Sequence, residues 1–376
     1  MKKVILGLSG GVDSAVALAL LLEKGYQVEA VFMQNWDSAI NNDIKGNPTS
    51  KFEKCAQTID YEDALKVAKK LKVKLTKIDF IKEYWQKVFA YFLAEYQKGR
   101  TPNPDILCNN EIKFKSFLEY AFSKDADYIA MGHYARKEER AGVTHLLRGK
   151  DNNKDQSYFL SQLTSEQLKR VLFPIGELSK KEVRERAFQQ KLAVYDKKDS
   201  TGICFIGERD FELFLANYLP AQKGLMKTID GKVIKEHNGL YNYTIGQRKG
   251  LDIGGLKDYP PAPWFVIGKD LSANVLYVGQ GYHNEYLYSN NCIVKDVVFR
   301  GDKDLENRFF TAKFRYRSED VKVTLEWLDE TTLKVIYPDQ ERAVTPGQAA
   351  AFYEGEVCVG GGFIDQVYFD QERRLY

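Results

Sequence analysis

Short apolar runs alternate with helical patterns through the first part of the chain. An apolar run at residues 3–8 suits a buried strand, and further strands are predicted at residues 28–33, 73–80 and 127–133. Apolar residues at helical spacing predict helices over residues 13–24, 60–71 and 84–98, with Asp60 as the N-cap of the second. A capping box at Ser179 and Glu182 predicts one more helix. Strands separated by helices favour a doubly wound parallel α/β sheet, with ligands at the carboxyl ends of its strands.

The pattern changes after about Gly207. Glycine and proline become frequent around residues 246–263, which predicts a small, loop-rich central domain. From about Gly281, short alternating runs separated by charged turns predict a C-terminal antiparallel β-barrel, with strands at residues 311–317, 321–328 and 332–337. We therefore expect three domains, covering residues 1–207, 208–280 and 281–376.

Composition narrows the class of protein. Hydrophobic residues make up 44% and charged residues 28% of the 376 residues, as in a folded soluble chain, so a disordered or fibrous protein is excluded. The net charge of +3 excludes a wholly basic nucleic-acid sleeve, so any surface for nucleic acid is a local patch. The uninterrupted apolar run 15–22 is far shorter than the roughly 20 residues of a membrane span. We expect a soluble protein without a membrane partner.

The five cysteines are scattered and show no CxxC pair or zinc-site spacing: Cys55, Cys108, Cys204, Cys292 and Cys358. This usage is typical of a reduced, cytoplasmic chain.

The first predicted strand runs into Ser9, Gly10, Gly11, Val12, Asp13 and Ser14, and a helix follows at once. Glycines let the backbone approach an anion, and the N–H groups and positive dipole end of a helix then bind it. The alternative is an ordinary strand-to-helix turn with Ser and Asp as caps. The loop lacks the lysine of a Walker motif and is not GxGxxG, so it indicates a nucleotide phosphate site of another kind.

Two segments place cysteines beside polar residues. The two prolines of residues 101–109 predict an extended loop that projects the Cys108 thiol and the Asp105 carboxylate together. In residues 197–205, we expect Lys197 and Lys198 to lower the pKa of the Cys204 thiol. The alternative is that both cysteines are buried apolar residues and that the lysines are solvated.

Longer motifs carry a resemblance to known enzymes. SGGVDS resembles the pyrophosphatase loop of the N-type ATP pyrophosphatases, which split ATP into AMP and pyrophosphate. TPNPDILCN, DSTGICFIGER, MGHYAR, DNNKDQSYFL and YTIGQRKGL resemble signature segments of the tRNA-specific 2-thiouridylase family, and together they span all three expected domains. The polar residues 40–49 look like an insert that relatives need not share.

The resemblance implies an adenine-nucleotide α-hydrolase-like sheet that binds ATP and Mg²⁺, with no dedicated protein metal site. Asp13 would help to organise the magnesium-bound pyrophosphate, and Met33 would lie beside the adenine. The nucleotide-binding residues that it implies are Gly7, Leu8, Ser9, Gly10, Gly11, Val12, Asp13, Ser14, Met33 and Gly132.

The resemblance also implies the chemistry of the cysteines. ATP would adenylate the C2 oxygen of a wobble uridine, position 34 of tRNA, and sulfur from a persulfide on Cys204 would replace AMP. Cys108, as the second thiol, would complete the transfer by forming a disulfide with Cys204. Asp105 would act as general acid or base near the base. A persulfide donor or relay protein would load Cys204, and we expect a cytoplasmic monomer.

A further set of residues is expected to contact tRNA. Lys313, Arg315 and Arg317 alternate with aromatic residues, so a strand would place three cations on one face; a merely solvated basic face is the alternative. The resemblance implies that the first three of the following residues surround the target base and that the others contact tRNA: Asn103, Pro104, Asp105, His133, Lys154, Asp155, Gln156, Arg315, Tyr316 and Gln348.

Two other functions compete with tRNA thiolation. An N-type synthetase would use the adenylate to form a C–N bond on a small metabolite, and tRNA-dependent release of pyrophosphate would separate it from a thiolase. A non-catalytic tRNA-binding protein with a relict nucleotide loop would produce no AMP.

Overall fold

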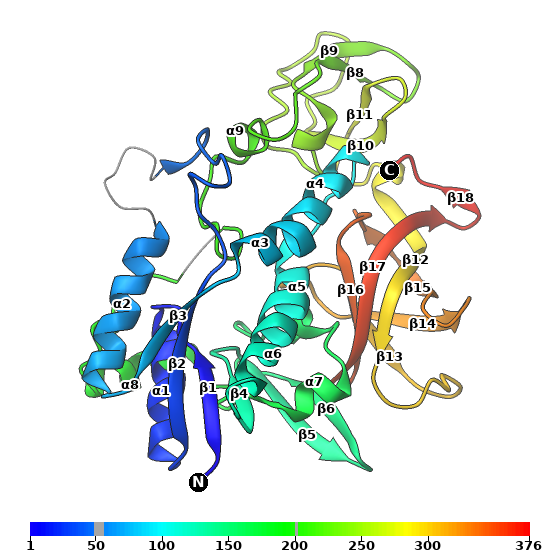
Figure 1. Ribbon diagram of the computed structural model, residues 1–376. Coiled ribbons are helices and arrows are strands. Elements are labelled where there is room, and N and C mark those ends of the chain that lie inside the picture. Colours follow the sequence, from blue (N-terminus) through cyan, green and yellow to red (C-terminus); the bar gives the residue numbers. More distant parts are fainter. Residues whose placement is uncertain (49–55, 200–201) are drawn as a thin grey trace.

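The computed structural model describes residues 1–48, 56–199 and 202–376. Figure 1 shows three parts: a sheet with helices that holds the N-terminus, a β-barrel beside it, and a small β unit above both. Of the residues and motifs given above, Thr49, Cys55, Ser200 and Thr201 lie outside the described residues.

The first sheet is parallel and has the strand order β3-β2-β1-β4-β7. Its strands are β1 (Lys3–Gly7), β2 (Gln27–Gln34), β3 (Leu75–Asp79), β4 (Tyr128–Ala130) and β7 (Val171–Leu172). The order steps from β1 outward in both directions, which is the doubly wound topology that the sequence predicts. The carboxyl ends of β1, β2 and β4 therefore meet at one edge.

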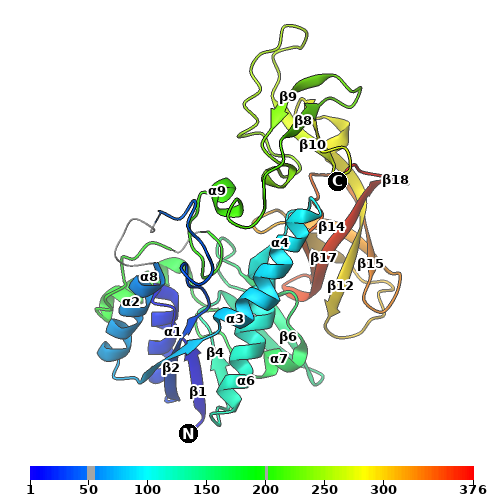
Figure 2. The same cartoon turned by 45° about the horizontal axis from the view of Figure 1, so that its top comes forward.

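Helices cover both faces of this sheet. One apolar cluster packs under α1 (Val12–Glu23), α2 (Ala56–Lys70) and α8 (Lys180–Gln189), which lie together in Figures 1 and 2. The prediction that Asp60 caps the second helix is wrong, because α2 already includes residues 56–59. The capping box at Ser179 is confirmed, since its hydroxyl accepts from the Glu182 N–H at the start of α8.

A second apolar cluster packs against the other face of the sheet. Some of the helices that contribute to it contain π-helical turns. The predicted helix over residues 84–98 is α3 (Ile81–Tyr84), the π-helix η2 (Trp85–Phe89) and α4 (Ala90–Gln97) in succession. After a short break come α5 (Pro104–Leu107), the π-helix η3 (Cys108–Ser116) and α6 (Phe117–Phe122). In a π-helix the backbone bonds run from i to i+5, and such turns are frequent at functional sites.

The structure corrects the extended loop expected around Cys108. Pro104 occupies the first turn of α5, and the Asn103 side chain caps that helix by accepting from the Asp105 N–H. A proline in this position starts a helix rather than preventing one, because its missing N–H is not needed there. Cys108 consequently begins η3 and is fully buried.

The central part contains a four-stranded sheet of order β10-β11-β8-β9. Its strands are β8 (Gly224–Lys227), β9 (Val233–His237), β10 (Trp264–Asp270) and β11 (Val275–Gln280). The short helices of the molecule are η4 (Ser157–Leu160), α7 (Ser165–Lys169), α9 (Phe211–Leu215), η5 (Leu240–Asn242) and η6 (Glu285–Leu287).

The C-terminal part is an antiparallel barrel, as expected, and pairing of β12 with β17 closes it. Its strands are β12 (Tyr288–Phe299), β13 (Phe310–Lys313), β14 (Val321–Trp327), β15 (Leu333–Arg342), β16 (Ala349–Glu354) and β17 (Val357–Phe369), and β18 (Glu372–Arg373) pairs with β17. The hairpin β5 (Ala135–Arg140) and β6 (Val143–Arg148) adds to β17 from the first part of the chain. The barrel and the first part therefore share a sheet.

The basic strand expected at residues 311–317 is shorter than predicted. β13 ends at Lys313, Arg317 has a φ of +66°, and the Lys313 ammonium lies 3.7 Å from the Asp320 carboxylate. Lys313, Arg315 and Arg317 therefore do not line one strand face.

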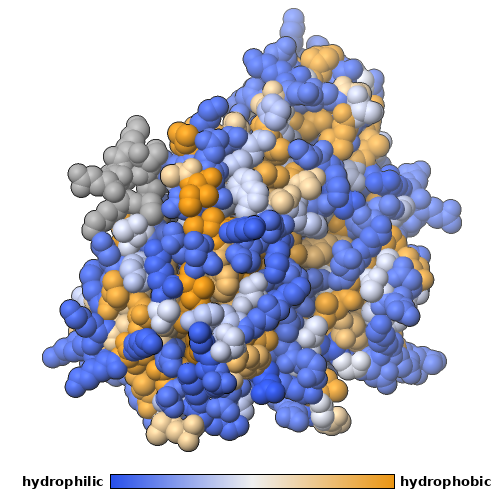
Figure 3. All heavy atoms as spheres, in the orientation of Figure 1, coloured by the Kyte–Doolittle hydropathy of each residue, from blue (hydrophilic) through white to orange (hydrophobic). Residues whose placement is uncertain are grey.

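Figure 3 shows one face of the molecule, and hydrophilic residues dominate its outer edge. Within the described parts of the chain, no helix is long and apolar enough to cross a membrane.

Candidate active site

The loop between β1 and α1 presents backbone donors at the carboxyl edge of the sheet. Gly11 is the N-cap of α1 and has no side chain that could accept a hydrogen bond. The N-cap side chain therefore satisfies none of the N–H groups in the first turn of the helix. The Ser9 and Ser14 hydroxyls lie 3.1 Å apart, and the Ser9 N–H donates to Ser14 Oγ. This geometry suits an anion that accepts from several donors at once.

Two glycines are required by the close packing around this loop. Gly10 has a φ of +78°, and a Cβ there would lie 2.1 Å from the Asp60 carbonyl oxygen. A Cβ on Gly132, which follows β4, would lie 2.8 Å from the Ser14 nitrogen. Met33, at the end of β2, is 7% exposed, and its Cε would lie 3.1 Å from a Cβ on Gly7. The expected nucleotide residues therefore gather at one edge of three adjacent strands.

Asp13 is held by neighbours that sequence analysis did not single out. The Tyr134 hydroxyl donates to its carboxylate at 2.7 Å, and the Lys180 ammonium lies 2.8 Å from the same oxygen. Lys180 also pairs with Asp199 at 2.7 Å, and although burial alone would raise the pKa of Asp199, the charges of Lys154 and Lys180 lower it to about 2. A polar network thus fixes the first turn of α1 next to the loop.

The two cysteines expected to act together are adjacent. The Sγ atoms of Cys108 and Cys204 lie 3.6 Å apart, and both thiols are free. An S–S bond is about 2.05 Å long, so this separation is a thiol contact that a small movement could convert to a disulfide. Cys108 is buried, whereas residue Cys204 as a whole is half-buried.

Hydrogen bonds from two helices fix the backbone of Cys204. Its N–H donates to Asp105 Oδ1 at 3.1 Å, and its carbonyl accepts from the Tyr84 hydroxyl at 2.9 Å. The chain bends sharply here, with a bridge between Ile203 and Gly207 and a φ of +67° at Phe205. The structure therefore brings Asp105, Cys108 and Cys204 together, as predicted.

The electrostatic environment distinguishes the two thiols. The hydrogen bond from Cys108 lowers the pKa of Cys204 and, together with the charge of Lys113, outweighs the opposing effect of burial. Burial, followed by the hydrogen bond to Cys204, raises the pKa of Cys108. Burial also raises the pKa of the Asp105 carboxyl, against the Cys204 N–H and Lys113. Cys204 is thus the more acidic thiol of the pair, and Cys108 is its hydrogen-bond donor.

The expectation that Lys197 and Lys198 activate Cys204 is not met. The Lys197 ammonium is 2.8 Å from Asp60 and 2.7 Å from Asp63 and donates to the Gly10 carbonyl, so it joins α2 to the phosphate loop. Lys198 is exposed. The cation beside the thiols is Lys113, five residues after Cys108 on η3.

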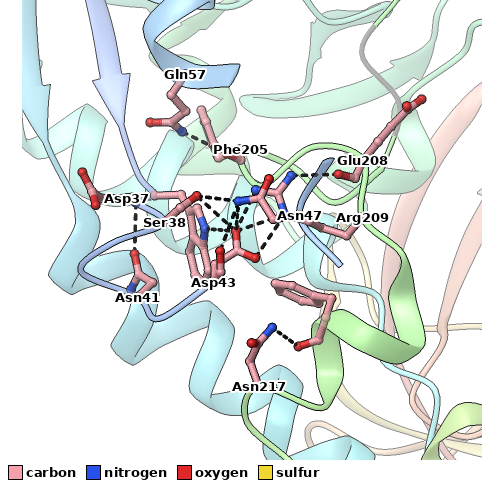
Figure 4. A network of polar contacts seen from close by, with 12 residues as sticks. Asp37, Ser38, Asn41, Asp43, Asn47, Gln57, Phe205, Glu208, Arg209 and Asn217 are labelled. Carbon is pink, nitrogen blue, oxygen red and sulfur yellow. Dashed lines mark hydrogen bonds and ion pairs between the residues drawn. The ribbon is translucent and has the colours of Figure 1, made fainter. Parts of the chain in front are cut away.

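A polar network connects the loop after β2 to the segment that carries Cys204 (Figure 4). The Arg209 guanidinium lies 2.7 Å from Asp43 Oδ2, with the two side chains 4% and 0% exposed. Trp36 Nε1 donates to the same carboxylate at 3.0 Å. Residues 40–48, which look like an insert in the sequence, therefore anchor the chain next to the thiols.

We predict that Asp43→Ala destabilises the protein by about 3–5 kcal/mol, because it leaves the Arg209 charge buried without a partner. Thermal or urea unfolding monitored by circular dichroism measures this loss. The exposed pair of Lys232 and Asp258, 3.2 Å apart, is the matched control, and Asp258→Ala should cost about 0–1 kcal/mol. An Asp43→Ala protein as stable as the control would contradict the anchoring role.

Three family models match successive parts of the chain. Residues 2–208 match a model described as "tRNA methyl transferase HUP domain", residues 212–280 match "tRNA methyl transferase PRC-barrel domain", and residues 289–364 match "Aminomethyltransferase beta-barrel domain".

Among curated proteins, the chain is similar to tRNA-specific 2-thiouridylase MnmA of Acholeplasma laidlawii, with 60% identity over 100% of this chain and 99% of that protein. The chain belongs to the tRNA-specific 2-thiouridylase family. The relatives of the same name from onion yellows phytoplasma and Streptococcus thermophilus are 55% and 54% identical, over 100% and 98% of this chain and 100% and 96% of their own lengths.

Some of the protein residues that the 2-thiouridylase resemblance assigns to tRNA contact lie around the thiol pair. Gln348 Nε2 donates to the Thr101 carbonyl at 2.6 Å, so a turn of the barrel holds the segment that leads to Asn103, Pro104 and Asp105. The Tyr316 ring packs 4.4 Å from that of Phe159, measured between centroids. The barrel thus closes over the segment beside Cys108.

Other implied tRNA residues are engaged in contacts within the protein. The Arg315 guanidinium donates to the Ala343 carbonyl at 2.7 Å and to Thr345 Oγ1 at 3.0 Å. His133 is buried beside the rings of Phe114 and Phe173, and burial, with the nearby Lys113 charge, lowers its pKa well below the usual value.

The segment of residues 154–156 is tied to its surroundings as well. Lys154 pairs with Asp199 at 2.7 Å, buried Asp155 accepts from the Gly149 N–H, and Gln156 Oε1 accepts from the Tyr134 N–H. In this conformation these side chains fix the chain between β6 and η4. A direct contact of any of them with RNA requires these bonds to be exchanged.

Proposed function

We propose that this protein is an ATP-dependent tRNA-uridine 2-sulfurtransferase, which converts the wobble uridine of tRNA to 2-thiouridine and releases AMP and pyrophosphate. The observation that carries the proposal is the contact of Cys108 and Cys204, 3.6 Å apart, with Asp105 bonded to the Cys204 backbone. The same protein also has a glycine loop that is suited to binding phosphates. The name of its relatives, tRNA-specific 2-thiouridylase, agrees with both features.

The descriptions of the matching family models name methyl transferases or an aminomethyltransferase rather than a thiouridylase. A methyl group transferred to RNA needs no pair of adjacent thiols. A sulfur transfer that ends in a disulfide does need them. The thiol geometry therefore favours sulfur transfer over methylation.

The phosphate loop is the proposed site of ATP. The N–H groups at the start of α1 and the hydroxyls of Ser9 and Ser14 would hold the phosphates, and Met33 and Gly132 would lie beside the nucleotide at the ends of β2 and β4. In the described parts of the chain, no three His, Cys, Asp or Glu side chains form a metal-binding group. These residues fit a Mg²⁺ ion held mainly by phosphate oxygens and water, with Asp13 as the nearby carboxylate, and the ion would neutralise charge on the leaving pyrophosphate.

The chain's residues then divide the sulfur chemistry between them. The Cys204 thiolate attacks the terminal sulfur of a donor persulfide; a new S–S bond forms, the donor's S–S bond breaks, and its electron pair leaves as the donor thiolate. The resulting persulfide attacks C2 of the adenylated uridine, and AMP leaves with the former C2 oxygen. Cys108 next attacks Cys204 Sγ, forming the Cys108–Cys204 disulfide and releasing 2-thiouridine, and a cellular dithiol reduces the disulfide. Asp105, with its raised pKa, would take or give the proton near the base.

The tRNA is proposed to lie between the first part and the barrel. Asn103, Pro104 and Asp105 would surround the base turned out of the anticodon loop, and Arg315, Tyr316 and Gln348 would contact the RNA from the barrel. His133 and the segment of Lys154, Asp155 and Gln156 would contact the tRNA after their present bonds within the protein are exchanged. We propose domain limits at 207/208 and 280/281, a cytoplasmic monomer, and a persulfide donor or relay protein as the source of sulfur.

Nucleoside mass spectrometry tests this function. Unmodified tRNA, ATP, Mg²⁺ and a persulfide donor are incubated with the protein, and 2-thiouridine, AMP and pyrophosphate are measured. We expect all three products in equal amounts, and none without ATP. Pyrophosphate release that needs a small amine but no tRNA would instead indicate a C–N-forming synthetase. An absence of AMP under every condition would indicate a non-catalytic binding protein.

A further inference from the structure

Lys113 is placed beside the thiol pair by an unusual helix. It lies five residues after Cys108 within the π-helix η3 (Cys108–Ser116). In an α-helix, residues i and i+5 point to different sides, because only residues three and four apart are neighbours. In a π-helix the wider turn bonds residue i to i+5, so Cys108 and Lys113 lie one above the other. The π-helical geometry therefore directs the ammonium toward the sulfur atoms.

The groups around Lys113 favour its positively charged form. Its Nζ lies 5.4 Å from the centre of the ring of Phe205, the residue that follows Cys204 in the chain. Burial alone would lower the pKa of Lys113, but its attraction to Cys204, Cys108 and Asp105 raises it. These negative neighbours therefore favour the charged form of Lys113, which is half-buried.

The other groups that face the thiol pair do not supply positive charge. Asp105 contributes a carboxyl group, Tyr84 a buried hydroxyl whose pKa is raised well above its usual value, and His133 an imidazole kept neutral by burial and by Lys113 itself. Lys197 is bound to Asp60 and Asp63. Of the groups named here, Lys113 is the one that brings positive charge to Cys204.

We propose that Lys113 is the positioning residue that holds Cys204 as a thiolate and so makes Cys204, rather than Cys108, the sulfur acceptor. This role rests on the proposed function. In the loading step, the Cys204 thiolate forms a bond to the terminal sulfur of the donor persulfide and the donor thiolate leaves. Lys113 neither gains nor loses a proton in this step. It stabilises the negative charge first on Cys204 Sγ and then on the terminal sulfur of the new persulfide.

The pH profile of thiol alkylation tests this role without tRNA or ATP. Iodoacetamide modification is followed cysteine by cysteine with peptide mass spectrometry in the wild type, Lys113→Met, Lys113→Gln and Lys113→Arg. In the wild type, Cys204 should react at a pH below the usual thiol pKa of about 8.5. Each neutral variant should move the Cys204 midpoint upward by about one pH unit, which slows alkylation about tenfold at a pH well below both midpoints. Lys113→Arg should restore most of the rate.

Lys115→Met is the matched control, since Lys115 lies on the same helix but is exposed and pairs with Glu111 at 3.0 Å. It should leave the Cys204 profile unchanged. An unshifted midpoint in a folded Lys113→Met or Lys113→Gln protein would overturn the role of Lys113. If the midpoint shifts but the wild type forms no 2-thiouridine, the proposed function fails and the thiolate role of Lys113 stands.

Discussion

Cys204→Ser abolishes 2-thiouridine formation and leaves no persulfide on the enzyme, because serine offers no sulfur to accept the terminal sulfur of a donor. Adenylation needs no sulfur, so this variant should still release AMP in the presence of tRNA. The pKa of the Cys204 thiol is lowered, chiefly by the hydrogen bond from Cys108, which fits its role as acceptor. Intact-protein mass spectrometry after incubation with the donor measures the added sulfur atom.

Cys108→Ser separates the two thiols. It should still accept a persulfide on Cys204 but should release 2-thiouridine below the detection limit, because no thiol 3.6 Å away can resolve the intermediate. Cys292→Ser is the matched control, since that cysteine is fully buried in the barrel core, and it should retain full thiolation. Normal thiolation by Cys108→Ser would show that Cys204 acts without a second thiol.

Asp13→Asn lowers tRNA-dependent AMP formation by about 100-fold or more, because a carboxylate that helps to place the metal-bound pyrophosphate is lost. Binding of tRNA, measured by filter retention, should change little. The change also weakens the ion pair with Lys180, which keeps its bond to Asp199. Steady-state release of pyrophosphate measures the effect.

Asp127→Asn provides the control for Asp13→Asn. Asp127 accepts from the Lys3 N–H at the amino end of β1, the opposite edge of the same sheet. Its substitution should leave AMP formation within about twofold of the wild type, since ligands bind at the carboxyl ends of such strands. Equal losses in both variants would show that the effect of Asp13→Asn is structural and would remove the support for the phosphate site.

Sequence patterns predicted the parallel sheet and the barrel because their apolar periods repeat over whole elements. They also located the glycine loop, since Ser9 to Ser14 join a strand directly to a helix. The conformation around Cys108 was predicted wrongly, because Pro104 was interpreted as a helix breaker although it lies at the start of α5. The length of β13 was overestimated for a similar reason: alternation of Arg315 with aromatic residues does not reveal the turn that ends the strand.

The contacts that complete the site come from residues far apart in the chain. Asp43 and Arg209 are separated by 166 positions, and no local pattern marks either as a partner. Lys113 was missed because its side of the helix depends on π-helical bonding, which hydrophobic spacing does not report. Lys197 was assigned to Cys204 by its nearness in sequence, but two carboxylates on α2 bind it more strongly.

The most direct test of the central claim follows one labelled sulfur atom. Cys204 is first loaded with a ³⁴S persulfide, free donor is removed, and ATP, Mg²⁺ and unmodified tRNA are added without reductant. The account predicts up to one ³⁴S-labelled 2-thiouridine for each loaded enzyme, together with a Cys108–Cys204 disulfide found by non-reducing peptide mapping. Unlabelled tRNA and a persulfide that stays on Cys204, in a reaction that releases AMP, would contradict it.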